Sequence, residues 1–142
     1  MNVKQALKQK NKLVTELKAQ YQILQKYNSI EEGNPRRYSM DSTIDRIQTL
    51  SNELVELKTK IHKANQPVYA QIFQLAELKG QIKELKKVPT DEGKQTDRYG
   101  SVPSVKEVEL TIVNINSIVE NLQEIVEEIQ NELDVHNATT NI

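Results

Sequence analysis

Apolar residues recur at alternating steps of three and four along the last third of the chain. The positions are Ile112, Ile115, Val119, Leu122, Val126, Ile129 and Leu133. This spacing places the side chains on one face of a helix and is typical of a heptad seam. Ile118 and Ile125 widen the stripe, so we expect this face to contact more than one other helix.

The same periodicity predicts three earlier helices, over residues 2–28, 41–65 and 67–87. The apolar positions of the second helix are the most regular: Ile47, Leu50, Leu54, Leu57, Ile61 and Ala64. Those of the first helix are interrupted by Lys10: Val3, Leu7, Val14, Leu17, Tyr21 and Leu24. Leu13 lies beside that frame, and a loop of about a dozen residues makes an antiparallel hairpin of the first two helices the simplest arrangement.

The third helix is less regular than the second. We expect its buried face to consist of four residues: Ile72, Leu75, Ile82 and Leu85. Gly80 inside this helix lowers its stability by about 1 kcal/mol relative to Ala. We therefore interpret Gly80 as the mark of a close contact with another helix.

Turn and capping residues separate the first two helices. The cluster at residues 31–35, Glu-Glu-Gly-Asn-Pro, cannot continue a helix. Ser39, Asp41 or Ser42 can cap the second helix, and Asp45 three residues after Ser42 resembles a capping box.

Residues 88–103 are expected to be irregular, and the start of the last helix lies between 104 and 112. One start uses Ser104 as the cap. The other leaves an extended segment after residue 103 and uses Thr111 as the cap, and β-branched residues before Thr111 favour it. The tail after residue 135 contains poor helix formers, so we expect it to leave the helix.

Composition supports an all-α fold without a deep core. The chain has 142 residues, no Trp, no Cys and one Phe. At this length we expect a single helical domain, 1–142, arranged as long antiparallel hairpins in an elongated four-helix bundle or coiled coil. The lack of cysteine excludes disulfides and Cys-based zinc sites. No segment has the length of a signal peptide or a membrane span, so we expect a cytoplasmic protein.

The net charge of −1 hides a strong asymmetry. Residues 1–28 contain six lysines and one glutamate, a net charge of +5, whereas residues 112–142 carry six acidic residues and no Lys or Arg. We expect the basic first helix to pack against the acidic last helix. The alternative is a basic arm that binds nucleic acid or anionic lipid.

Few residues are candidates for chemistry. His62 and His136 are the only imidazoles, and we interpret them as residues at helix C-termini and not as metal ligands. Two loops combine Arg with Tyr and can contact an anion or a partner protein, since guanidinium groups match carboxylates and phosphates. The residues are Arg36, Arg37, Tyr38, Arg98 and Tyr99. No catalytic constellation and no phosphate-binding loop is present in the sequence, so we expect no enzyme activity and no cofactor.

Three short motifs resemble a family of uncharacterised bacterial helical proteins, some of which are named septicolysin. The motifs are Ile61-His62-Lys63-Ala64-Asn65, Arg98-Tyr99-Gly100-Ser101 and Asn137-Ala138-Thr139-Thr140-Asn141-Ile142. The family has Ser where this chain has Gly100, and Trp where it has Ala138. The resemblance implies an all-helical fold, and the septicolysin name implies a cytolysin, but the family has no established activity.

The sequence therefore favours a non-catalytic helical scaffold or protein-interaction module that forms homo-oligomers. Thin apolar stripes on long helices bury further surface only when another chain covers them. The first alternative is a membrane-active, cytolysin-like protein, which rests on the resemblance. The second is an electrostatic nucleic-acid binder that uses the lysines of the first helix.

Overall fold

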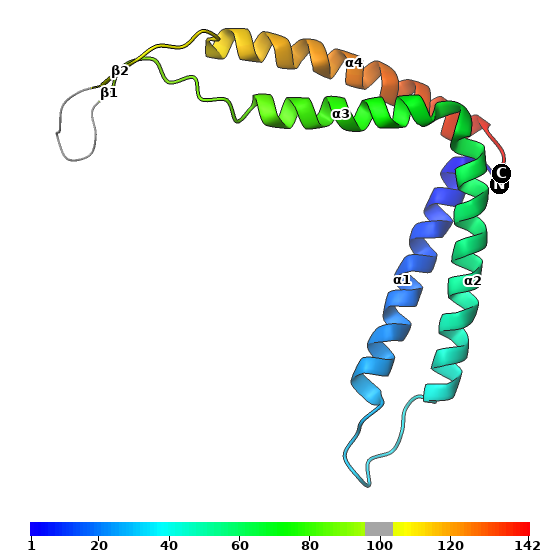
Figure 1. Cartoon of the computed structure of the whole chain (residues 1–142). Helices are drawn as coiled ribbons and strands as arrows, with labels where there is room; N and C mark the ends of the chain where they lie inside the picture. The colour runs from blue at the N-terminus through cyan, green and yellow to red at the C-terminus, as the bar shows by residue number, and fades with distance from the viewer. Residues whose placement is uncertain (96–103) are drawn as a thin grey trace. The chain divides into compact units, whose positions relative to one another are not determined.

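The protein is mostly helical, as predicted. The computed structural model describes residues 1–95 and 104–142. The elements in order are α1 (Val3–Tyr27), α2 (Met40–Asn65), the 3-10 helix η1 (Gln66–Val68), α3 (Tyr69–Leu85), β1 (Gly93–Gln95), β2 (Ser104–Lys106) and α4 (Ile112–Thr139). Figure 1 shows them in chain colours.

The chain divides into two compact units, whereas its length alone predicted one domain. The first unit comprises Met1–Val68 together with Val135–Ile142, and the second comprises Tyr69–Asp134. Each unit contains one pair of antiparallel helices: α1 with α2, and α3 with the longer part of α4 (Figure 1).

The α1–α2 hairpin has a leucine core. Leu13, Leu50 and Leu54 form a buried cluster, and the partly buried Leu17 and Leu57 pack against it. Near the loop end of the hairpin, the Arg46 guanidinium lies 3.2 Å from the Glu16 carboxylate of α1. Burial of the leucine side chains contributes most to the stability of the hairpin, because each buried leucine removes apolar surface from water.

The two helices of this hairpin follow the sequence prediction to different degrees. In α2 the predicted positions Ile47, Leu50, Leu54 and Ile61 are all buried. In α1 Leu13 is buried, whereas Val14 and Tyr21 of the predicted frame are exposed. One residue corresponds to about 100° of helix rotation, so the choice of Leu13 turns the following residue out of the seam.

The predicted pairing of the basic first helix with the acidic last helix is not found within this unit. The buried face of α1 packs against α2. Of α4, only the end that follows residue 134 belongs to the same unit. The next helix in the chain, α2, is joined to α1 by a short loop. Because closing a short loop costs little conformational entropy, α2 is the favoured partner of α1.

Capping residues fix the starts of three helices. Asn2 forms a capping box with Gln5, in which the Gln5 amide donates to Asn2 Oδ1 (2.8 Å). Ser39, one of the three candidates, caps α2 by accepting a hydrogen bond from the Ser42 amide (3.2 Å). Thr111 caps α4 by accepting one from the Asn114 amide (3.2 Å), so the later of the two predicted starts is correct.

The third helix is shorter than predicted, and its predicted buried face contains no fully buried residue. Pro67 lies in η1, and α3 occupies Tyr69–Leu85 within the predicted 67–87. No residue of α3 is fully buried. Gly80 does not mark a close contact within the chain, because a Cβ added there meets no atom within 4 Å.

The segment between α3 and α4 contains a small antiparallel ladder, where residues 88–103 were expected to be irregular. Gly93 pairs with Lys106, and Gln95 pairs with Ser104. The residues at 104–106 are therefore extended, as the β-branched pattern indicated.

The predicted end of the last helix at residue 135 is wrong, because α4 continues to Thr139. The Thr140 amide donates to the His136 carbonyl (2.9 Å), and the Val3 amide donates to the Thr140 carbonyl (2.9 Å). The first bond continues the helical pattern, and the second is a tertiary bond that holds the tail in place despite its weak helix propensity.

Candidate functional site

The loop between α1 and α2 contains three of the five predicted contact residues. Arg36 donates from Nη1 to the Tyr27 carbonyl (2.8 Å) and from Nη2 to the Asn28 carbonyl (3.0 Å). The Tyr38 ring lies 4.9 Å from the Tyr27 ring. Arg36 thus satisfies carbonyls that the end of α1 leaves without a partner.

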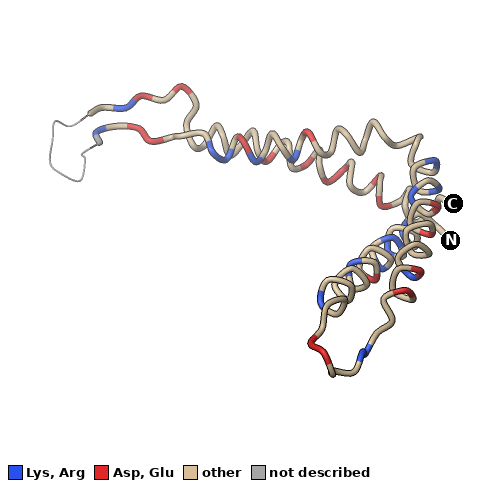
Figure 2. The backbone as a smooth tube through the Cα atoms, turned by 60° about the horizontal axis from the view of Figure 1, so that its bottom comes forward, with Lys and Arg blue, Asp and Glu red and all other residues tan. Residues whose placement is uncertain are grey.

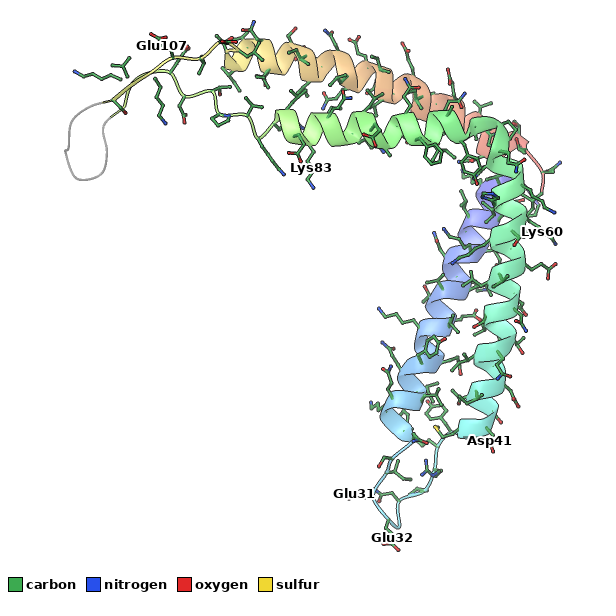
Figure 3. All side chains as sticks on the ribbon, in the orientation of Figure 1. Glu31, Glu32, Asp41, Lys60, Lys83 and Glu107 are labelled. Carbon is green, nitrogen blue, oxygen red and sulfur yellow. The ribbon has the colours of Figure 1, made fainter. Side chains whose placement is uncertain are left out.

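Arg37 is the residue of this loop that remains available to a partner. It is exposed and makes no hydrogen bond or ion pair with the described residues. Figure 3 places Glu31 and Glu32 at the tip of the same loop.

Arg98 and Tyr99 lie outside the described residues. An anion site built from both Arg-Tyr loops therefore stays a prediction. The part of the site that the structure describes supports a structural role for Arg36 and Tyr38 at the end of α1.

His136 connects the ends of two helices. Its Nε2 lies 3.2 Å from Asn65 Oδ1, and its Nδ1 lies 3.1 Å from Thr140 Oγ1. Among the described residues, no group of three or more His, Cys, Asp and Glu side chains is placed to hold a metal ion. Both ring nitrogens of His136 have protein partners, so this histidine joins α2 to the end of α4.

The sequence did not predict that the two ends of the chain meet. Asn2 and Asn141 form an antiparallel bridge, and Asn2 Nδ2 donates to the Ala138 carbonyl (3.2 Å). The Ile142 amide donates to the Met1 carbonyl (3.0 Å). The capping box at Asn2 is visible in the sequence, but its second partner, 136 residues away, is not.

A surface hollow in the first unit is lined by both apolar and charged residues. Its lining consists of Met1, Gln9, Leu13, Glu53, Glu56, Leu57, Lys60 and Ile142. Glu56 and Lys60 form an exposed ion pair (3.1 Å).

The apolar surface of the second unit is the strongest candidate for binding. Phe73 of α3 stacks on Tyr69 (centroids 5.7 Å apart) and is nevertheless 64% exposed. On α4, Ile115 and Val119 are buried, whereas Ile118 and Ile125 are 38% and 40% exposed. The widened stripe that the sequence predicted is therefore only partly covered within the chain.

Two segments of like charge contain the side chains that give the chain its charge asymmetry. The lysine segment, residues 4–18 of α1, contains Lys4, Lys8, Lys10, Lys12 and Lys18. The glutamate segment, residues 120–134 of α4, contains Glu120, Glu124, Glu127, Glu128, Glu132 and Asp134. No ion pair within the described parts of the chain includes a residue of either list. Figure 2 colours the lysines and arginines of the described chain blue and its acidic residues red.

Membrane-spanning potential and similarity to known proteins were also assessed. No helix in the described ranges is both long enough and apolar enough to cross a membrane. No family model, curated protein or solved structure matches the chain.

Proposed function

We propose that this protein is a non-catalytic helical scaffold that associates with copies of itself. The association completes the elongated four-helix packing that the heptad patterns predict, with hairpins from different chains supplying the helices. The observation that carries the proposal is that α3 buries no residue fully and α4 leaves part of its apolar stripe exposed.

A two-helix layer gains little stability unless a further layer covers it. Most helical stability in proteins comes from tertiary packing of an apolar face. The α1–α2 hairpin supplies such packing with its leucine cluster. The α3–α4 hairpin exposes Phe73, Ile118 and Ile125 instead, and another chain that covers them removes this apolar surface from water.

A second copy is the partner whose charge fits best. The described chain carries an unpaired basic segment and an unpaired acidic segment of the same length. Complementary charge directs association and disfavours partners that carry like charge. One sequence therefore contains both halves of a complementary contact.

Light scattering after size exclusion over a range of protein concentrations tests the proposal. We expect an oligomer whose dissociation midpoint rises at least about tenfold in the double variant Ile118→Gln/Ile125→Gln, because two apolar contacts are lost. Val55→Gln is the matched control, since Val55 is an exposed apolar residue of α2. A wild-type chain that stays monomeric at every concentration contradicts the proposal.

The two alternative functions depend on the lysine segment being free. Lys4, Lys8 and Lys12 are exposed and unpaired among the described residues, which also suits a nucleic-acid or anionic-lipid surface. The same chromatography with anionic vesicles or a DNA duplex separates these functions. A monomer that shifts onto either probe and dissociates from it in high salt contradicts the scaffold.

A cytolysin-like activity, which the septicolysin resemblance implies, stays a prediction. Leakage of a dye from neutral and anionic vesicles measures it directly. If the chain is a scaffold, we expect no leakage at concentrations where it is fully oligomeric.

A further inference from the structure

We infer that the contact between copies is an antiparallel pairing of α1 of one chain with α4 of another, in a single register. This inference rests on the proposed self-association and specifies its geometry. It assigns an occupant to the apolar residues that α4 leaves exposed, and it assigns a partner to each charged segment.

The exposed apolar residues of the two helices have the same spacing. Val14 and Tyr21 of α1 are seven residues apart and are 43% and 44% exposed. Ile118 and Ile125 of α4 are also seven residues apart and are 38% and 40% exposed. Seven residues correspond to about 10.5 Å along a helix. Because the two pairs have the same spacing, each residue of one pair can contact one residue of the other pair at the same time.

Each pair also lies at the edge of a buried seam. Val14 follows the buried Leu13, and Ile118 precedes the buried Val119. A helix that packs on one side of such a seam leaves the neighbouring apolar positions for a second helix. The exposed residues are therefore extensions of two existing apolar faces.

Charge selects the direction of the pairing. With Val14 opposite Ile125 and Tyr21 opposite Ile118, residues 4–18 of α1 lie opposite residues 121–135 of α4. These ranges contain five lysines and five acidic residues respectively. The parallel alternative places residues 4–18 opposite 108–122, where Glu109 and Glu120 are the only acidic residues.

Unfavourable charges are few in the antiparallel register. The range 121–135 contains no Lys or Arg. Glu16 is the single acidic residue of the lysine segment, and it already pairs with Arg46 of α2. Lys10 and Lys18 lie four residues on either side of Val14 and therefore on the same face of α1, and Glu128 and Glu132 lie three and seven residues after Ile125 on α4.

The smallest assembly that gives every α1 and every α4 a partner is a twofold dimer. In a twofold dimer, α1 of each copy contacts α4 of the other, so the contact occurs twice. Each contact then brings together the α1–α2 hairpin of one chain and the α3–α4 hairpin of its partner. The four-helix packing with a basic helix against an acidic helix, which the sequence predicted, is formed between chains.

Cysteine pairs test the register, because the natural chain has no cysteine. A V14C chain labelled with nitrogen-15 is mixed with an unlabelled I125C chain and oxidised, and mass spectrometry counts the mixed disulfide. We expect at least about tenfold more of it than from V14C mixed with I118C. Equal or reversed yields overturn the register, as does a dominant I125C–I125C dimer.

A double-cysteine chain, V14C/I125C, separates pairing between chains from closure of one chain on itself. We expect disulfide-linked dimers that persist on dilution during oxidation. A monomer with an internal disulfide overturns the inference, because α1 then reaches α4 of its own chain.

Charge reversal tests the electrostatic part. The variant Lys10→Glu/Lys18→Glu and the variant Glu124→Lys/Glu128→Lys are each expected to dissociate about tenfold more readily than wild type, and a mixture of the two to recover a mixed dimer. Lys58→Glu/Lys63→Glu on α2 is the control. If the apolar variants weaken association and the reversals do not, the scaffold stands and this inference fails.

Discussion

The two helical hairpins differ in how completely each covers its own apolar residues. In the α1–α2 hairpin Leu50 is fully buried, and α2 presents one regular face to α1. In the α3–α4 hairpin, α4 also buries one face, but on α3 Ile72 and Leu75 are only partly buried and Phe73 is exposed. A hairpin closes a seam only when both helices concentrate their apolar residues on one face.

Among the described residues, the second hairpin contains a buried side-chain oxygen without a hydrogen-bond partner, and the first hairpin contains none. Gln71 of α3 has a buried Oε1 without a hydrogen-bond partner. An unsatisfied buried oxygen opposes folding. We therefore expect the first hairpin to be the more stable unit, and we propose that the second supplies the surface for association.

The largest expected effect comes from removing a core leucine of the first hairpin. Leu50→Ala should lower the free energy of unfolding by about 2–5 kcal/mol, because it leaves a cavity in a fully buried site. Leu75→Ala, at a partly exposed position of α3, should cost clearly less. Urea unfolding followed by circular dichroism, at concentrations below association, measures both. Equal losses would mean that the hairpins do not differ.

Removal of the helix caps probes the two hairpins separately. Ser39→Ala and Thr111→Ala should each cost about 1 kcal/mol, because an amide at the helix start loses its acceptor. Amide hydrogen exchange should speed up in the first turn of α2 for one variant and of α4 for the other. Thr111→Ser retains the hydroxyl and is the control. Faster exchange throughout both hairpins would contradict the division into two units.

The smallest expected effect is a gain in the second hairpin. Gly80→Ala should raise the free energy of unfolding by about 0.5–1 kcal/mol, since Ala favours a helix and its Cβ meets open space. Gly33→Ala should lower it, because Gly33 has φ of +88°. Thermal unfolding of dilute protein measures both. A loss of stability in Gly80→Ala would show that another helix packs closely on α3.

Sequence periodicity was most reliable where one face was apolar and the rest polar. It predicted the buried apolar positions of α2 and all four buried positions of α4. Ser39 was one of three predicted caps of α2, and Thr111 was one of two predicted caps of α4. It was weaker for α1, where both Leu13 and Val14 fitted a stripe and only packing against α2 decided between them. It also misplaced the end of α4, which hydrogen bonds from the other end of the chain extend to Thr139.

For the candidate site, too, the sequence indicated some features and the structure added others. The sequence identified Arg36 and Tyr38 as unusual loop residues, but only the structure showed that they complete the end of α1. The separation of charge between residues 1–28 and 112–142 was evident from the sequence. That both charged segments remain unpaired became visible only with the side chains in place.

The sequence by itself determined where the four helices lie, since this depends on spacing, capping hydroxyls and breaks within a few residues of each position. The tertiary structure decided which helices share a seam, which half of each stripe is buried and how the two ends of the chain meet. These choices depend on contacts between residues far apart in sequence, such as Asn2 with Ala138 and Leu13 with Leu50. Local periodicity carries no information about such contacts, because many partners satisfy the same apolar face.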